Sequence, residues 1–236
     1  GQFFDYQALS FTHGRLDVPP EAVGIEAFVY HGKSYGYWGP FPAFLRLPLA
    51  VFGRGPWVGH TARASCLLAA MLTVAAFGGV AHEIALIAGR PFRRRLTLVA
   101  LLGLVFGSTL LFLLSWSYVF HEVLLWAGAL VQISAWLGLR HLRTGSLPAL
   151  LGAIATAAGA GLTRPTLGYG AILGAALVTG VTALAAWRAA ALSGSGSAGS
   201  SSCSAWPRPW AWPESCRSPT TMSASTRSAR PSNPTR

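Results

Sequence analysis

The sequence predicts an all-α protein that forms a multi-pass transmembrane helical bundle. Hydrophobic residues make up 52% of the chain and charged residues only 11%, whereas about a quarter of the residues in a typical soluble domain are charged. Five apolar segments follow one another between residues 61 and 188, and short clusters of arginine separate them. The net charge of +11 is therefore distributed like charge that sets membrane topology, and not like a surface that binds nucleic acid.

Residues 1–60 are predicted to form an extracytoplasmic loop with short interfacial helices. This segment holds four of the seven acidic residues and the only lysine, together with many aromatic residues, glycines and prolines. Within it, residues 40–51 are apolar but include Arg46 and Pro48. A helix needs about 20 apolar residues to span a bilayer, so we expect 40–51 to be a re-entrant or interfacial helix, or the lead-in to the first span.

Residues 61–188 are predicted to form a transmembrane bundle of about five helices. Apolar runs of this length must be helical in lipid, because their backbone groups find hydrogen-bond partners there only within a helix or a closed barrel. The two-residue alternation of a barrel strand is absent from the sequence. The expected spans are 64–88, 96–114, 119–139, 147–162 and 169–187.

Arginine sets the expected orientation of these spans. Positively charged loops stay in the cytoplasm, and the connections after the first, third and fifth spans carry arginine, whereas the opposite connections carry only Arg164. We therefore expect the segment 1–60 to lie outside the cytoplasm, at the plasma membrane of a bacterium (the inner membrane). The cytoplasmic arginines would be Arg90, Arg93, Arg94, Arg95, Arg140, Arg143 and Arg188.

Small residues recur every four positions in the last two expected spans. They are Ala153, Ala157 and Gly161 in the fourth span, and Gly170 and Gly174 in the fifth. This spacing allows two helices to pack closely. The alternative is that alanine and glycine are simply common in this part of the chain.

Residues 189–236 are predicted to form a disordered low-complexity tail. From residue 193 onward the composition changes to Ser, Gly, Pro and Arg, which cannot bury a core. One hypothesis is that this tail is translated out of frame or belongs to a truncated gene. Since the chain begins with Gly and no signal-peptide pattern precedes residue 3, we also expect it to be a fragment that lacks an upstream span.

Two ionisable residues mark the outer ends of expected spans. Glu122 lies at the start of the third span and Arg164 at the end of the fourth. An ionisable residue at membrane depth is a functional candidate, and an arginine can hold phosphate with two parallel hydrogen bonds. The alternative, which is compatible with this, is a Glu122–Arg164 ion pair that locks two helices together.

Asp5 is the candidate general base, because it stands among Phe3, Phe4 and Tyr6 at a membrane face. The alternative is an ordinary exposed aspartate at the start of a helix. Lys33 precedes a rigid aromatic loop that suits sugar binding or headgroup anchoring equally well. Neither the three cysteines nor the histidines have a metal-binding spacing, so we expect no metal site.

Several segments together resemble a known family. They read FFDYQALSFTHGRLD, GKSYGYWGPFPAFLRLP, YVFHEVLLWAGAL and GLTRPTLG, and the resemblance covers residues 3–187. The chain is similar to multi-pass glycosyltransferases of the GT-C superfamily, which contains the protein mannosyltransferase-like and bacterial family 39-like enzymes. It departs from that family in having fewer spans and no soluble carboxyl-terminal domain.

The resemblance implies transfer of a sugar from a polyprenyl-phosphate donor to an acceptor on the extracytoplasmic face. Asp5 matches the catalytic carboxylate of the family, which takes the acceptor proton in an inverting single displacement. Substrate-binding candidates are Lys33, Arg46 and Arg164 for the donor phosphate, together with Glu122. The implied partners are membrane lipid and the lipid-linked sugar, with no cofactor and no nucleic acid.

Two other functions remain open from the sequence. A transporter or flippase of lipid-linked sugars would place an ionisable site on broken helices near the bilayer midplane, whereas the charges here lie near the ends of the spans. A non-catalytic multi-pass membrane protein would need no acid-bearing aromatic loop, although such a loop does not exclude it.

Overall fold

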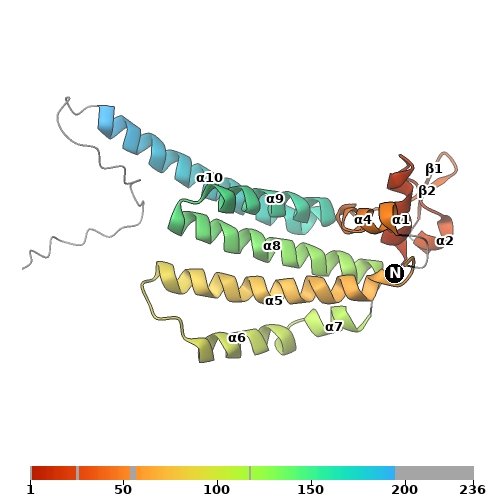
Figure 1. The fold of residues 1–236 in the computed structure, drawn as a ribbon, viewed down its shortest axis with the longest axis horizontal. Helices are drawn as coiled ribbons and strands as arrows, with labels where there is room; N and C mark the ends of the chain where they lie inside the picture. Colours follow the sequence, from red (N-terminus) through yellow and green to blue (C-terminus); the bar gives the residue numbers. More distant parts are fainter. Residues whose placement is uncertain (1, 25–26, 54–56, 117, 195–236) are drawn as a thin grey trace, which may run out of the picture.

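The computed structural model describes residues 2–24, 27–53, 57–116 and 118–194, and this part of the chain is mostly helical (Figure 1). A small amino-terminal unit caps one end of a long helical bundle. The predicted tail from residue 195 onward lies outside the described residues. The amino-terminal unit contains α1 (Phe3–Thr12), α2 (Pro20–Val23), β1 (Phe28–Tyr30), β2 (Lys33–Tyr35), α3 (Phe41–Phe44) and α4 (Leu47–Phe52). The bundle contains α5 (Thr61–Ile87), α6 (Arg94–Gly107), α7 (Leu110–Ser115), α8 (Val119–Thr144), α9 (Leu147–Thr163) and α10 (Pro165–Gly194).

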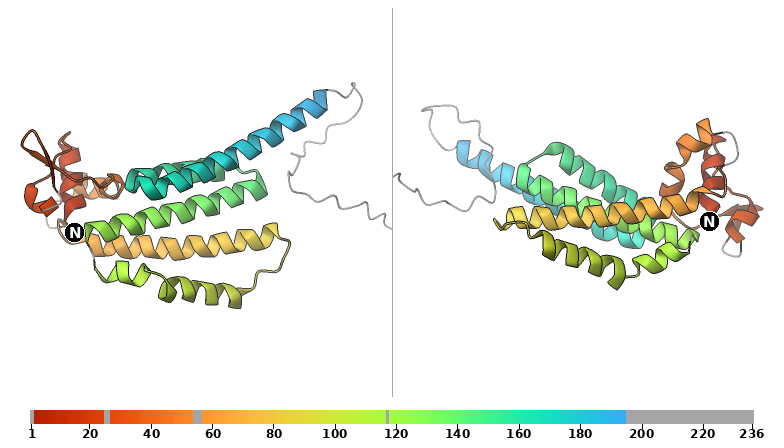
Figure 2. Two further views of the ribbon diagram at one scale, coloured as in Figure 1. Left: turned by 180° about the vertical axis from the view of Figure 1, so that it is seen from behind. Right: turned by 60° about the horizontal axis from the view of Figure 1, so that its bottom comes forward.

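Three of the described helices are long and apolar enough to cross a membrane: Thr61–Ile87, Val119–Thr144 and Pro165–Arg188. Helix α9 is apolar but has only 17 residues. The bundle helices run side by side, with α8 between α5 and α9 and with α10 packed along α9 (Figures 1 and 2). Helix α10 continues to Gly194, so the predicted boundary at residue 188 falls inside a helix.

The expected second span is not one continuous helix. It is divided into α6 and α7, because the backbone becomes extended at Ser108. The Ser108 hydroxyl donates to the carbonyl oxygen of Leu104 and accepts the N–H of Leu110 at 3.2 Å. A serine side chain that bonds the nearby backbone in this way competes with the regular helical pattern. Five apolar segments were predicted to span the membrane. Only three of the described helices are long enough, because the second segment is broken and α9 is short.

The arginine-rich connections gather at one end of the bundle. In Figure 1 the link from α5 to α6 and the link from α8 to α9 both lie at the end opposite to α1. At that end Arg143 donates from Nε to Glu83 at 2.6 Å and so joins α8 to α5. The amino-terminal unit and the arginine-rich connections are therefore separated by the length of the bundle.

Small residues bring α8, α9 and α10 together, although not all at the predicted positions. Ala153 and Ala157 are buried, as a close helix contact requires. On α10 the close approach is made by Gly168, where a Cβ atom would overlap the backbone of Gly161. Gly170 and Gly174 instead face open space, so of the two alternatives left open for them, close helix contact is wrong.

The amino-terminal unit has a core of aromatic rings. Phe3 packs edge-on against both Phe4 and Trp38, with ring centroids 5.0 Å apart in each pair. Val123 of α8 belongs to the same buried cluster, so the unit is packed directly on the bundle. The predicted interfacial segment 40–51 forms the two short helices α3 and α4 of this unit.

A second contact fixes the amino-terminal unit to the end of α9. The N–H of Gly39 donates to the carbonyl oxygen of Thr163 at 3.3 Å. The two backbones lie so close that a Cβ atom at position 39 would overlap the carbonyl group of Leu162. Glycine is required here because only a residue without a side chain permits this approach.

Candidate functional site

Asp5 lies in the first turn of α1 and is fully buried. Its Oδ1 atom pairs with Nε of Arg46 at 2.6 Å and also accepts the hydroxyl of Thr61. Its Oδ2 atom accepts the backbone N–H of Gly59 at 2.7 Å. The alternative of an ordinary exposed aspartate at a helix start was therefore wrong, because the carboxylate is enclosed by donors from three other places in the chain.

Arg46, between α3 and α4, connects two carboxylates. Its side chain is 4% exposed and its Nη2 atom donates to Oε1 of Glu122 at 2.7 Å, while Nε pairs with Asp5. Nη1 donates to the carbonyl oxygen of Pro42 at 3.0 Å, and Nε also lies 2.8 Å from the Thr61 hydroxyl. A planar guanidinium suits this position because its fixed fork of donors can serve several acceptors at once.

Glu122 completes the cluster from the first turn of α8. The carboxylate is fully buried, and Oε1 accepts hydrogen bonds from both Arg46 and the hydroxyl of Ser65. Trp126 in turn donates from its indole nitrogen to the Ser65 oxygen at 2.8 Å. Oε2 is buried and has no hydrogen-bond partner among the described residues, so it remains able to accept one more donor.

The structure brings together three of the five predicted site residues. Asp5, Arg46 and Glu122 form one buried cluster. Arg164 does not pair with Glu122, which was the predicted helix lock, because Arg46 occupies that position and the Arg164 guanidinium lies over the ring of Phe120, 4.6 Å from its centroid. Lys33 is exposed on β2 of the hairpin and is not among the groups that contact the cluster.

The donors from Gly59, Thr61 and Ser65 were missed by sequence reasoning. Thr61 and Ser65 stand four residues apart, which places them on one face of a helix. Two hydroxyls at this spacing, at the start of an otherwise apolar span, could have been predicted to act as hydrogen-bond donors in the site. The Gly59 donor could not have been predicted, because every residue except proline has a backbone N–H and the sequence does not show which one contacts Asp5.

Gly59 also forms part of a cavity of about 830 Å³. The cavity lies between the first turns of α5 and the connection from α7 to α8. Because Gly59 lines it and also donates to Asp5, only one backbone segment separates the cavity from the buried cluster. Neither this cavity nor the smaller one below is lined by Asp5 or Arg164. No group of three or more His, Cys, Asp or Glu side chains within the described ranges could hold a metal ion.

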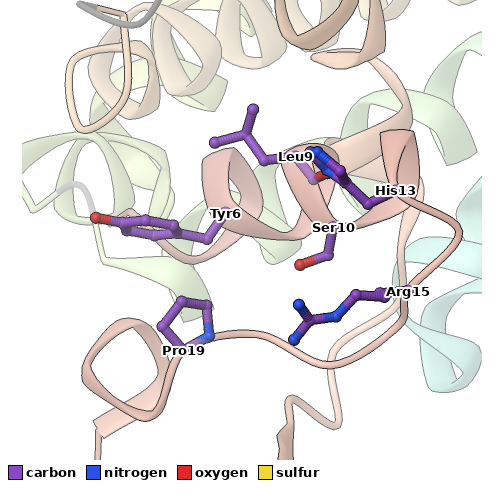
Figure 3. Close-up of a pocket in the computed structure, with 6 residues that line it drawn as sticks. All are labelled: Tyr6, Leu9, Ser10, His13, Arg15 and Pro19. Carbon is purple, nitrogen blue, oxygen red and sulfur yellow. The ribbon is translucent and has the colours of Figure 1, made fainter.

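A smaller cavity of about 170 Å³ lies between α1 and the connection from α1 to α2 (Figure 3). Tyr6, Ser10 and Arg15 are among the side chains that line it. The Arg15 guanidinium pairs with the carboxylate of Asp17, and this hydrogen-bonded pair lowers the pKa of Asp17 below its usual value. The cavity is too small for a ligand of ordinary size, so we assign the pair a local structural role.

The Asp17 carboxylate is expected to titrate below its usual range in the folded protein. A lowered folded pKa means that the pair stabilises the fold above the unfolded pKa and that this contribution is lost as the pH falls through the folded pKa. A carbon-13 NMR titration of the Asp17 carboxyl group measures the midpoint. The midpoint should rise in Arg15→Gln, and an unchanged midpoint in that variant would rule out the pair as its cause.

The chain was compared with known proteins at three levels. No protein-family model matches it, no curated protein matches it, and no solved structure matches it.

Proposed function

We propose that this protein is a membrane glycosyltransferase of the GT-C type, which transfers a sugar from a polyprenyl-phosphate donor to an acceptor hydroxyl. The observation that supports it is the gathering of Asp5, Arg46 and Glu122 from three separate segments. These charged groups meet where the amino-terminal unit joins the starts of α5 and α8. Buried ionisable groups at such a position in a membrane protein are candidates for function.

In this proposal the bundle is a multi-pass one in the bacterial inner membrane. Helices α5, α8 and α10 span it, and α9 and the broken pair α6–α7 form the other two of five transmembrane segments. The amino-terminal unit lies on the extracytoplasmic side, because the arginine-rich connections occupy the opposite end of the bundle. The many exposed apolar side chains of α6 and α10 support this arrangement, since such surfaces suit lipid better than water.

The proposed reaction is an inverting single displacement. The acceptor oxygen attacks the anomeric carbon, a bond forms between them, and the bond from that carbon to the phosphate oxygen breaks. Polyprenyl phosphate leaves with the electron pair, and Asp5 takes the proton of the acceptor. Among the described residues, Oδ2 of Asp5 accepts one hydrogen bond, from the Gly59 N–H, and keeps a second lone pair for this proton. Because Asp5 is fully buried, the segment that carries Gly59 must shift before the acceptor hydroxyl can reach it.

The remaining predicted residues take different roles in this scheme. Arg46 is a positioning residue, because each of its nitrogens already faces an acceptor in the protein. Glu122 holds Arg46 in place from α8. Arg164 and Lys33 stay candidates for the donor phosphate, since neither forms an ion pair with a carboxylate among the described residues.

Asp5→Asn is expected to lower sugar transfer by about 10²–10⁴-fold, the usual contribution of a general base. The assay uses the protein in membrane vesicles with a polyprenyl-phosphate sugar and follows glycosylated acceptor. Asp17→Asn is the matched control, because it removes a carboxylate of the same unit that lies outside the cluster, and it should keep transfer. A transfer rate in Asp5→Asn equal to that of the unchanged protein would refute the assignment.

A non-catalytic membrane protein is the second candidate, and a specific observation favours it. Both oxygens of Asp5 already have donors and its side chain is fully buried, as in a purely structural ion pair. A thermal unfolding measurement in detergent separates the two roles. If Asp5→Asn loses transfer but melts at the same temperature as the unchanged protein, Asp5 acts in catalysis. If Asp5→Asn melts at a lower temperature and the unchanged protein itself shows no transfer, Asp5 has a structural role.

The transporter or flippase alternative has one feature in its favour, the break between α6 and α7 at Ser108. Transporters place substrate sites at discontinuous helices. Yet Ser108 and Thr109, which form this break, are uncharged, and the buried charges lie at the helix ends instead. Movement of a labelled lipid-linked sugar across vesicles without formation of product would select this alternative.

A further inference from the structure

The cavity of about 830 Å³ beside Gly59 has the size of a small-molecule site, which is typically 300–1,000 Å³. Helix α5 provides one wall, and the end of α7 with the start of the link to α8 provides the other. In Figure 1 these parts lie at the end of the bundle where the amino-terminal unit sits. The cavity is therefore next to the Asp5 cluster without containing it.

One side of this cavity is positively charged. Arg63 carries this charge, His60 also lines the cavity, and none of the residues that line it is acidic. Within the described part of the chain no carboxylate lies within ion-pair distance of Arg63. Both residues stand at the start of α5, where the helix dipole adds partial positive charge. An arginine without a carboxylate partner is suited to a phosphate group. Ser115 lines the same cavity, and its hydroxyl donates to the carbonyl oxygen of Phe112 at 2.7 Å.

The other side of the cavity is apolar. Leu67 follows Arg63 by about one turn along α5, and Leu114 faces it from the end of α7. Trp116 and Tyr118 also line the cavity and stack on each other, with ring centroids 5.5 Å apart. Tryptophan and tyrosine in such positions are typical of the membrane interface. The cavity thus combines one charged side chain with two leucines, and Leu67 lies one turn further along α5 from its start than Arg63 does.

We propose that this cavity binds a phosphate group carried on a hydrocarbon chain, with Arg63 and His60 at the phosphate and Leu67 and Leu114 along the chain. That the lipid is the sugar donor rests on the proposed transferase function, whereas the binding site does not. Gly59 lines the cavity and donates to Asp5, so an occupant is placed to move the backbone segment that separates the cavity from this buried carboxylate. In this inference Arg63 holds the phosphate in place of Arg164 and Lys33, neither of which lines the cavity.

Binding of farnesyl phosphate to the purified protein in lipid nanodiscs tests this site. Farnesol and inorganic phosphate are the two comparison ligands, because each carries one half of the proposed chemistry. Arg63→Gln is expected to weaken farnesyl phosphate binding by about 10- to 100-fold, which corresponds to one lost charge-assisted hydrogen bond. Leu67→Ser should weaken farnesyl phosphate more than inorganic phosphate. Arg15→Gln, which removes an arginine outside this cavity, should bind as the unchanged protein does.

Each outcome decides one part of the inference. Equal binding to Arg63→Gln and to the unchanged protein, with equal melting temperatures, overturns the phosphate site. Farnesol binding as tightly as farnesyl phosphate does the same. Inorganic phosphate binding as tightly as farnesyl phosphate overturns the lipid part. Farnesyl phosphate binding without any sugar transfer leaves this site in place and counts against the transferase alone, so the two proposals fail separately.

Discussion

Arg46→Met is expected to destabilise the protein by about 3–5 kcal/mol, the usual cost of removing one partner from a buried ion pair. The substitution keeps most of the side-chain volume but leaves the carboxylates of Asp5 and Glu122 buried without a positive partner. It also removes the donor to the carbonyl oxygen of Pro42. Thermal unfolding in detergent measures the loss, and limited proteolysis shows whether the amino-terminal unit is released first.

The matched control for this prediction is Arg63→Met, because Arg63 is exposed and has no carboxylate partner in the described ranges. It should change the melting temperature little. The triple variant Arg46→Met, Asp5→Asn and Glu122→Gln should regain part of the loss, since no buried charge then remains uncompensated. An Arg46→Met protein that melts like the unchanged one would contradict the buried position of this cluster.

Gly39→Ala is expected to destabilise the protein by about 3 kcal/mol, at the upper end of overpacking effects. The added Cβ atom would overlap the carbonyl group of Leu162, and a backbone group cannot rotate away as a side chain can. The loop must therefore move, which breaks the hydrogen bond from Gly39 to Thr163. A lowered melting temperature, with faster proteolysis of the amino-terminal unit than of the bundle, is the expected result.

Gly170→Ala provides the opposite case, because it makes the same substitution where a Cβ atom meets nothing within 4 Å. In the interior of α10 alanine is favoured over glycine by about 0.5–1 kcal/mol, so this variant should melt slightly higher. If both variants melt at the same temperature, the close approach of the amino-terminal unit to α9 is not as described.

The sequence predicts the helical class, and it predicts α5 and α8 well, because long apolar runs leave no alternative to helix in lipid. It fails at Ser108, where a single side chain that bonds the local backbone divides one expected span into two helices. It also fails at Gly170 and Gly174, since periodicity identifies small residues but not the direction in which the helix turns them. That choice depends on how α10 packs against α9.

The sequence identified the charged residues of the candidate site but not their partners, for a similar reason. Asp5, Arg46 and Glu122 were each singled out by charge in an apolar setting, but their pairing was not. Glu122 was matched with Arg164 because both stand at outer helix ends, whereas the structure pairs it with Arg46, 76 residues earlier. Contacts over such separations follow from how the amino-terminal unit is placed on the bundle, which no local pattern records.

This separation also affects how the protein is made. Asp5 and Arg46 leave the ribosome long before Glu122, and 76 residues take about 4–15 s to synthesise at typical rates. During those seconds the arginine has only one of its two carboxylate partners. The amino-terminal unit must therefore wait in an incompletely neutralised state until α8 has been synthesised, and its final docking is a late event in biogenesis.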